Sequence, residues 1–201
     1  MTRIRTLLAS AIALALFALP AAAERIPLSE ISRYLNSLTT AQSDFTQVNP
    51  DGSVSTGKLM MHRPGRVRFE YAQPDNSVVL AGGGQVAIFD AKSNQTAEQY
   101  PLSRTPLSII LDQNVDLSRA RMVVGHTEVE NTTRVVAQDP QRPEQGKIEM
   151  VFTANPTELR QWVITDNAGA QTTVILGELQ KGGNLASSLF SITSEQQRRS
   201  R

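Results

Sequence analysis

The sequence predicts a mainly β protein in which one antiparallel sheet carries a few short helices. From residue 43 onward, apolar and polar residues alternate over short runs, which is the period of a strand with one buried face. Turn residues separate these runs at intervals of about eight to twelve residues, which indicates an antiparallel meander rather than βαβ units. The chain has 201 residues, 40% of them hydrophobic, so it is long enough for one domain with a true core.

The N-terminus carries the features of an export signal. Two arginines precede an apolar run at 7–19, and a proline and three alanines follow it at 20–23. This pattern is typical of a cleaved secretory signal peptide. The run spans about 20 Å as a helix, against about 30 Å of hydrocarbon in a bilayer, so it is too short for a membrane anchor. We expect residues 1–23 to be the signal peptide, cleavage after Ala23, and a single soluble domain over 24–201.

A helix over 28–38 is the first element expected in the mature chain. Its apolar residues recur at helical spacing, and a proline at 27 suits a first turn. Strands then follow one another, separated by turns at 49–52, 63–65, 73–76, 82–84 and 91–94. The segment 66–72 alternates, with Val67, Phe69 and Tyr71 on one face and Arg66, Arg68 and Glu70 on the other.

A short, very apolar helix is expected over Ser103–Leu111, where Pro106 fits a first turn. Strands resume near 120–126 and 133–138 and again where Ile148, Met150 and Phe152 alternate. A hairpin is expected between 158–165 and 170–177. The segment 185–192 is a last apolar stretch, and we expect the tail 194–201 to be flexible.

Composition excludes several classes of function. Without the two arginines of the signal peptide, 18 basic and 19 acidic residues remain, a net charge of −1, so we expect no nucleic-acid partner. The chain has no cysteine, which excludes disulfides, thiol nucleophiles and Cys-ligated metals.

The remaining residues form no recognisable catalytic or metal motif. His62 and His126 are not in a metal-ligand spacing, and no serine lies in a G-x-S-x-G elbow. The glycines at 82–84 lack the lysine and helix of a phosphate loop, so we interpret them as a hairpin turn. We expect no enzyme, no metal and no cofactor. A hydrolase with an active site assembled from distant residues is the least favoured alternative.

A series of short motifs carries a family resemblance. In chain order they are Phe45-Thr46-Gln47, Gly57-Lys58-Leu59, Arg63-Pro64-Gly65-Arg66-Val67-Arg68-Phe69-Glu70-Tyr71, Pro74, the glycines at 82–84, Thr105-Pro106-Leu107, Leu159-Arg160-Gln161-Trp162 with Asp166 and Gly169, and Leu189-Phe190-Ser191-Ile192. This ordered series, over about 28–192, resembles the periplasmic outer-membrane lipoprotein carrier family, the LolA-like proteins. The last motif is similar to the closing apolar strand of that family.

The resemblance implies both a fold and a function. The fold is an unclosed antiparallel β-barrel, or half-barrel, covered by a small helical lid around an apolar cavity. The function is that of a periplasmic chaperone, a monomer without cofactors. It takes acylated lipoproteins from an ATP-driven releasing complex of the inner membrane and carries them to an outer-membrane acceptor. A carrier or sensor of another amphiphile, such as a glycolipid, is the alternative on the same scaffold.

The resemblance also assigns site residues. Arg63 matches the arginine that hydrogen-bonds the lid and holds it shut; the alternative is a solvated arginine at a strand end. The residues matched to the acyl-chain cavity are Val67, Phe69, Tyr71, Val79, Ile88 and Phe89 on the strands, and Leu107, Ile110 and Leu111 on the underside of the lid. For all of these the alternative is an ordinary core.

Overall fold

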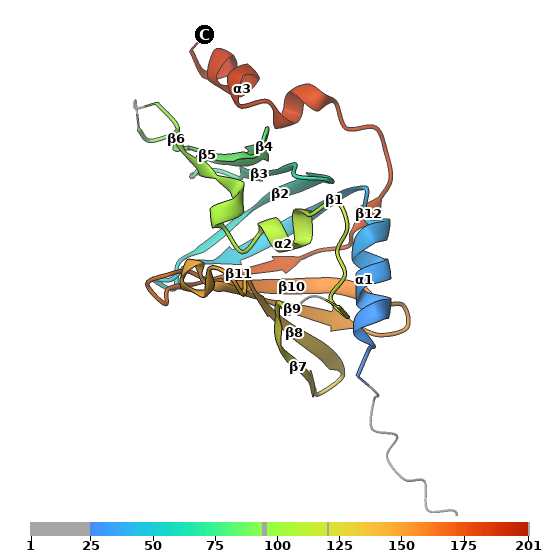
Figure 1. The fold of residues 1–201 in the computed structure, drawn as a ribbon. Helices are drawn as coiled ribbons and strands as arrows, with labels where there is room; N and C mark the ends of the chain where they lie inside the picture. Colours follow the sequence, from blue (N-terminus) through green and yellow to red (C-terminus); the bar gives the residue numbers. More distant parts are fainter. Residues whose placement is uncertain (1–24, 94–95, 120, 201) are drawn as a thin grey trace, which may run out of the picture.

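The computed structural model describes residues 25–93, 96–119 and 121–200. The strands form one antiparallel sheet in the order β6-β5-β4-β3-β2-β1-β11-β10-β9-β8-β7, and β12 pairs with the beginning of β1 (Figure 1). The outermost strands, β6 and β7, do not pair with each other, so the sheet curves without closing. The half-barrel predicted from the sequence is confirmed, whereas the predicted signal peptide, 1–23, lies outside the described residues.

The strands are β1 (Thr40–Val48), β2 (Val54–His62), β3 (Val67–Tyr71), β4 (Val78–Gly82), β5 (Gln85–Phe89), β6 (Glu98–Pro101), β7 (Val123–Val129), β8 (Thr132–Gln138), β9 (Lys147–Thr153), β10 (Glu158–Thr165), β11 (Gln171–Leu176) and β12 (Gln180–Lys181). The helices are α1 (Leu28–Ser37), η1 (Leu102–Arg104), α2 (Ser108–Leu111), η2 (Pro143–Gln145), η3 (Ser187–Phe190) and α3 (Ile192–Arg199).

The turns join the strands as the sequence predicts. Each of β1 to β5 pairs with the next strand in the chain, which is the expected meander. Gly83 and Gly84 link β4 to β5 with positive φ angles, a conformation that glycine adopts without strain. The expected late hairpin is β10–β11, in which Trp162 lies opposite Val174.

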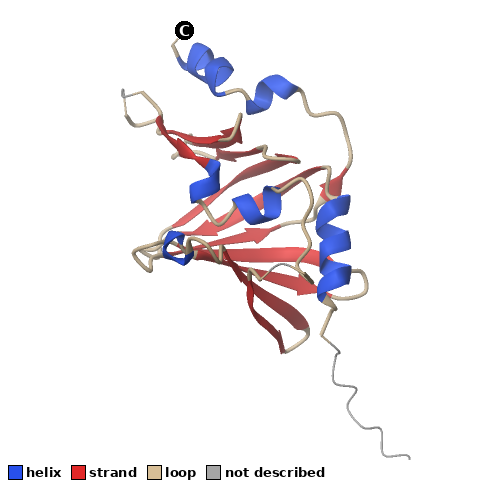
Figure 2. Ribbon diagram, in the orientation of Figure 1, coloured by secondary structure: helices blue, strands red, loops and turns tan. Residues whose placement is uncertain are grey.

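Helices lie on both faces of the sheet (Figure 2). On the inner face, α1 places Ile31 and Leu35 in the main core with Phe152 and Trp162, all four almost completely buried. Tyr34 of α1 packs edge-on against Phe152, with ring centroids 6.1 Å apart. The short helices η1 and α2 cross the same concave face, and together (102–111) they form what we call the lid. Within the described residues, no helix has the length and apolar character that a membrane span requires.

The C-terminal segment differs from its prediction. Residues 189–192, expected as a strand, end η3 and begin α3, and the tail expected to be flexible from 194 is helical as far as Arg199. This segment runs across the outer face of the sheet near β3 and β4. It is ordered because it buries Phe190 and Glu195 against those strands. The apolar helix expected over 103–111 is also divided, into η1 and α2.

Candidate functional site

A cavity of about 1040 Å³ lies between the concave face of the sheet and the lid. This volume is at the upper end of the range of about 300–1,000 Å³ typical of small-molecule pockets. Its apolar lining is Phe69, Tyr71, Val79, Val86, Ile88 and Tyr100 from β3–β6, Pro106 and Leu107 from the lid, and Trp162, Ile164 and Val174 from β10 and β11. These side chains give the cavity an apolar wall suited to hydrocarbon. The lining also includes the uncharged polar residues Gln47, Thr105, Gln145, Asn167 and Thr172.

Aromatic rings pack edge to face at the base of this cavity. The ring centroid of Phe45 is 5.4 Å from that of Phe69 and 5.2 Å from that of Tyr71, and the centroid of Phe69 is 6.3 Å from that of Trp162. These contacts connect β1, β3 and β10, which are distant in the sequence. They hold the two halves of the concave face together.

One partly buried polar group of this aromatic cluster has a hydrogen-bond partner. The hydroxyl of Tyr71 donates to Oε1 of Gln47 at 2.8 Å. Burial raises the pKa of Tyr71 to about 12, even though the hydrogen bond with Gln47 opposes that rise. The phenol therefore stays neutral at physiological pH, and the cavity wall acquires no charge at this position.

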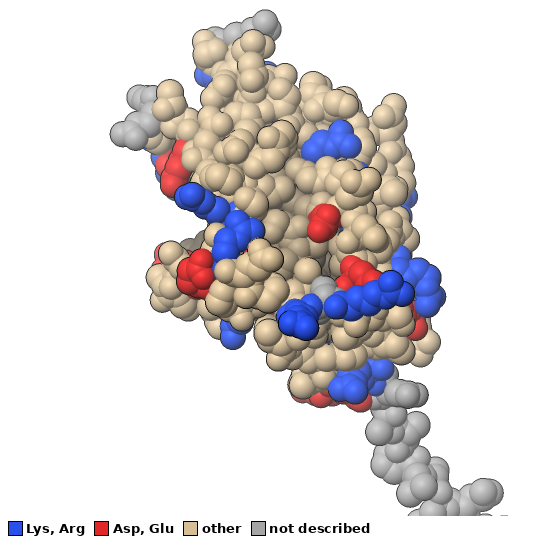
Figure 3. All heavy atoms as spheres, in the orientation of Figure 1, with Lys and Arg blue, Asp and Glu red and all other residues tan. Residues whose placement is uncertain are grey.

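Charged residues surround the mouth of the cavity. Glu98 and Arg104 line it on the side of β6 and η1, and Glu144 and Asp166 line it on the side of η2 and the β10–β11 turn. In Figure 3 the surface is hollowed at the left of the view, with charged side chains above and below the hollow. All four residues are exposed. The mouth is thus open to water, whereas the interior is apolar.

Arg63 lies at the corner between β2 and β3 and is only 8% exposed. Its guanidinium donates to the backbone oxygens of Leu35 in α1 and of Asp112, directly after α2, and to Oδ1 of Asn36 at 3.2 Å. Burial lowers its pKa, and the nearby charge of Asp112 opposes that shift. A guanidinium nevertheless remains protonated at neutral pH. One cation therefore bonds the sheet, α1 and the end of the lid to one another.

Asn36 extends this junction. Its Nδ2 donates to the backbone oxygen of Val115 at 2.8 Å, and its Oδ1 accepts from the Val115 N–H at 2.9 Å. The hydroxyl of Ser32 accepts from the N–H of Leu117 at 2.9 Å. The segment after the lid is consequently fixed to α1, and the lid itself is bonded to the sheet by Gly65, whose N–H donates to the oxygen of Leu111 at 2.8 Å.

The family model described as outer membrane lipoprotein carrier protein LolA matches residues 36–193. The chain belongs to this carrier family.

Two relatives are similar to this chain over most of their length. An outer-membrane lipoprotein carrier protein of Methylococcus capsulatus is 26% identical over 184 residues, covering 84% of each chain. One of Cupriavidus necator is 24% identical over 211 aligned positions, covering 95% of each. The solved structure of a LolA superfamily protein from Nitrosomonas europaea covers 83% of this chain and 98% of its own, with 9% identity and a TM-score of 0.46. The recognition of the carrier family from its ordered motifs is confirmed.

The structure separates the residues matched to the carrier cavity into three groups. Phe69, Tyr71, Val79, Ile88 and Leu107 line the cavity. Val67, Ile110 and Leu111 belong to the main apolar core and are almost completely buried, but they do not line this cavity. Phe89 was placed wrongly: it packs with Val78, Leu80 and Ala87 on the outer face of the sheet. Adjacent strand residues point to opposite faces, so Ile88 and Phe89 cannot both face the cavity.

Several lining residues were missed by the sequence analysis. Trp162 and Ile164 line the cavity from β10, and Val86 and Tyr100 line it from β5 and β6. The alternation of Trp162 and Ile164 within 158–165 was a usable signal, because both had to share a face of the predicted hairpin. Tyr100 had no such signal, since its strand has only four residues.

The two histidines have structural surroundings. The ring centroid of His62 is 5.8 Å from that of Phe190, and Nε2 of His126 lies 2.9 Å from the backbone oxygen of Ile26. Burial lowers the pKa of both imidazoles. Among residues 25–93, 96–119 and 121–200, no three His, Asp or Glu side chains are grouped as a metal ion would require.

Proposed function

We propose that this protein is a periplasmic carrier that shelters the acyl chains of lipoproteins in the cavity under the lid. The observation that supports this most directly is the apolar cavity of about 1040 Å³ between sheet and lid, in a chain that belongs to the carrier family. Its function is binding and release, without catalysis. Its partners are acylated lipoproteins, an ATP-driven releasing complex in the inner membrane and an outer-membrane acceptor.

The physical chemistry of the cargo explains why such a cavity is needed. Each buried methylene contributes roughly 0.8 kcal/mol, so one long acyl chain in water is disfavoured by on the order of 10 kcal/mol. An acylated protein therefore cannot cross an aqueous compartment unshielded at a useful rate. The carrier must expose apolar surface when loaded and cover it when empty, which requires a movable cover.

The lid is the element suited to that movement. It is short, and the guanidinium of Arg63 contacts a backbone oxygen directly after it. We propose that these hydrogen bonds hold the lid shut in the empty carrier. Opening the lid would break few bonds and would uncover the lining of the cavity.

Replacement of Phe69 by glutamate tests the proposed function. The substitution places a carboxylate where acyl chains would lie, and an unpaired buried charge is costly, so lipoprotein capture should fall at least tenfold, which corresponds to about 1.4 kcal/mol. Capture of a purified triacylated lipoprotein is measured together with thermal unfolding. Val129→Glu, on an exposed edge position of β7, is the control.

The two measurements distinguish a cavity from an ordinary core. A folded Phe69→Glu variant that captures lipoprotein as well as the Val129→Glu control would contradict the proposal. So would a wild-type protein that captures none. Mass spectrometry of material that co-purifies from the periplasm separates the alternatives, because a glycolipid or free lipid in place of an acylated protein would favour a carrier of another amphiphile.

A further inference from the structure

The C-terminal segment Leu185–Arg199, which we call the strap, covers the outer face of the sheet behind the cavity. Phe190 and Leu185 pack against Met60 of β2. Ile192 packs against a small apolar cluster formed by β4 and β5. The backbone oxygen of Phe190 lies so close to Gly82 of β4 that an added Cβ would stand 2.0 Å from it. The strap therefore contacts β2, β4 and β5 by apolar packing.

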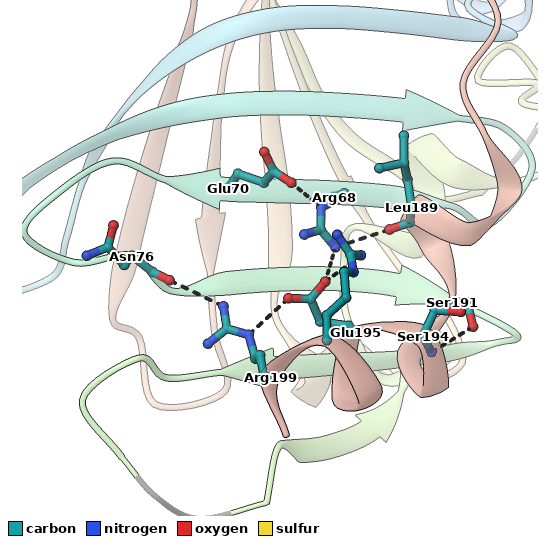
Figure 4. A network of polar contacts seen from close by, with 9 residues as sticks. Arg68, Glu70, Asn76, Leu189, Ser191, Ser194, Glu195 and Arg199 are labelled. Carbon is teal, nitrogen blue, oxygen red and sulfur yellow. Dashed lines mark hydrogen bonds and ion pairs between the residues drawn. The ribbon is translucent and has the colours of Figure 1, made fainter. Parts of the chain in front are cut away.

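A buried ion pair fixes the strap to β3 (Figure 4). Nη1 of Arg68 lies 2.9 Å from Oε2 of Glu195, and the two side chains are only 3% and 5% exposed. Arg68 also donates to the backbone oxygen of Leu189 at 3.2 Å and pairs with Glu70 at 2.6 Å. A buried ion pair is costly to break, because one charge is then left without its partner.

Glu195 connects β3 to the neighbouring strands as well. Its carboxylate accepts from Nε of Arg199 at 2.9 Å and lies 2.6 Å from Nη2 of Arg198. Arg199 in turn donates to the backbone oxygen of Asn76, in the β3–β4 turn, at 3.2 Å, and its guanidinium lies 5.4 Å from the ring centroid of Phe89 in β5. Glu195 thus contacts β3 directly through Arg68, and it contacts the β3–β4 turn and β5 indirectly through Arg199.

The strap and the cavity share a wall that is one strand layer thick. Arg68 lies between Val67, which is buried in the core, and Phe69, which lines the cavity, and these two point to the opposite face. Val79 and Ile88 line the cavity from the same β4 and β5 whose other faces contact the strap. The angles between β3, β4 and β5 therefore determine both the fit of the strap and the width of the cavity.

We propose that Arg68 and Glu195 are positioning residues of the cavity wall, and that docking of the strap holds β3–β5 inward and opposes cargo binding. This inference rests on the proposed function for the cargo itself. Phe69 of β3 packs edge-on against Trp162 of β10, with ring centroids 6.3 Å apart. Chains that enter between them must move β3 outward, toward the strap. That movement changes the spacing of Arg68, Asn76 and Phe89, which the strap fixes.

The direction of the effect follows from linkage. We call the conformation in which β3 lies farther outward the wide state. If a ligand binds only this state, its apparent affinity is its intrinsic affinity multiplied by the fraction of molecules in the wide state. Weakening the strap raises that fraction. A variant with a weakened strap should therefore bind cargo more tightly, and its empty cavity should be more accessible to small solutes.

Two variants and one control test this. Glu195→Gln removes the charge that pairs with three arginines. Gly82→Ala displaces the strap at Phe190 from a residue that neither belongs to the ion pair nor lines the cavity. Glu149→Gln is the matched control, because Glu149 pairs with Arg134 at 2.7 Å on the outer face of β8 and β9, where no contact of the strap is found in the described structure. Glu195→Asp should restore part of the wild-type behaviour.

Trp162 supplies a measurement that does not require cargo. It is the only tryptophan of the chain and is 1% exposed in the cavity wall. Quenching of its fluorescence by acrylamide, under conditions where every variant is fully folded, should increase in Glu195→Gln and Gly82→Ala but not in Glu149→Gln. The apparent Kd for a fluorescent dipalmitoyl lipopeptide should fall in the same two variants, and by roughly tenfold or more in Glu195→Gln, as expected for one lost charge-assisted hydrogen bond.

The outcomes separate this inference from the proposed function. Unchanged quenching and unchanged Kd in both strap variants, with only a loss of thermal stability, would overturn the inference and leave the strap a purely structural element. If the wild-type protein captures neither the lipopeptide nor a lipoprotein, the proposed function fails, whereas the quenching of Trp162 still decides whether the strap positions the wall.

Discussion

The guanidinium of Arg63 is held by acceptors from three separate segments of the chain. A rigid group with five donors is suited to this position, because the backbone oxygens of Leu35 and Asp112 and the side chain of Asn36 lie in different directions around it. A lysine would offer a single point of charge. Arg63 is only 8% exposed, so these bonds are largely shielded from water.

Replacement of Arg63 by leucine should leave a folded carrier with impaired release. Loss of the donor leaves buried carbonyl oxygens unsatisfied, so the free energy of unfolding should fall by about 1–3 kcal/mol. Because the closed empty state is weakened, loading should remain normal while release becomes slower, by roughly tenfold or more for one lost charge-assisted bond.

A two-step transfer assay measures this, with loading from inner membranes followed by release to outer membranes. Arg160→Leu is the control, since Arg160 pairs with Glu158 on β10 and is absent from the junction of lid and α1. Normal release by the Arg63→Leu variant would show that Arg63 takes no part in release and is only a residue at the end of a strand.

Residue positions were predictable from the sequence where a local pattern fixes the direction of the side chain. The alternation around Phe69 places Val67, Phe69 and Tyr71 on one face, as found. For Ile88 and Phe89 the run is apolar at both positions, because each face of β5 is covered, one by the cavity and lid and the other by α3. A strand that is covered on both sides gives no alternation, so the sequence alone could not assign Phe89 to the outer face.

At the scale of whole elements, α3 is the helix that the sequence did not predict. Its residues, ITSEQQRR, include a single apolar side chain, Ile192, and offer no apolar stripe. The helix is held instead by Glu195, whose partner on the sheet, Arg68, is 127 residues away in the chain. A contact at such separation leaves no local pattern, and a polar C-terminal segment is therefore expected to be flexible.

The charge of Glu195 should make the docking of α3 depend on pH. Burial on its own raises the pKa of this carboxyl, but hydrogen bonds from Arg199 and Arg68 and the charges of Arg68 and Arg198 outweigh it, so its pKa is lowered. The other acidic group at this site is Glu70, which shares Arg68. A lowered pKa means that the folded state binds the proton more weakly than the unfolded state. The stabilisation is then complete above the ordinary value of about 4.3 and is lost as pH falls through the folded pKa.

The free energy of unfolding of wild-type protein and of Glu195→Gln measures this dependence. At neutral pH the variant should be less stable by about 2–4 kcal/mol, because Arg68 keeps its charge in a buried position. The difference should shrink as pH falls below about 4 and should close once Glu195 is protonated. A difference that stays constant from neutral to acidic pH would show that the carboxylate charge is not what holds α3.

At the scale of the molecule, the carrier has one curved sheet and two different covers. The inner cover, α1 and the lid, encloses the main core and the cavity, whereas the outer cover, the strap, encloses two small apolar clusters. The sequence predicts the sheet and the inner cover, because strand alternation and helical spacing are local. It does not predict the outer cover, which depends on pairs that form only after the sheet has folded.

Export should leave a mature chain that begins at Glu24. The expected signal peptide lies outside the described residues, and the first described residue is Arg25. N-terminal sequencing of the protein from a periplasmic fraction should give Glu24 as the first residue. An intact Met1 in a membrane fraction would contradict cleavage.

The residues directly after the expected cleavage position contact the sheet. The residue at which the mature chain begins should therefore affect its stability. Ile26 is 4% exposed, its N–H donates to Oγ1 of Thr133 at 2.9 Å, and Arg25 donates to the backbone oxygen of His126 at 2.9 Å. Burial of an isoleucine side chain contributes about 1.5–3 kcal/mol and a hydrogen bond about 1 kcal/mol. A chain that begins at Leu28 should therefore be less stable in urea unfolding than one that begins at Glu24, by about 2–4 kcal/mol. A chain that begins at Arg25 is the control and should match the Glu24 form; equal stability of all three would show that this segment contributes nothing to the fold.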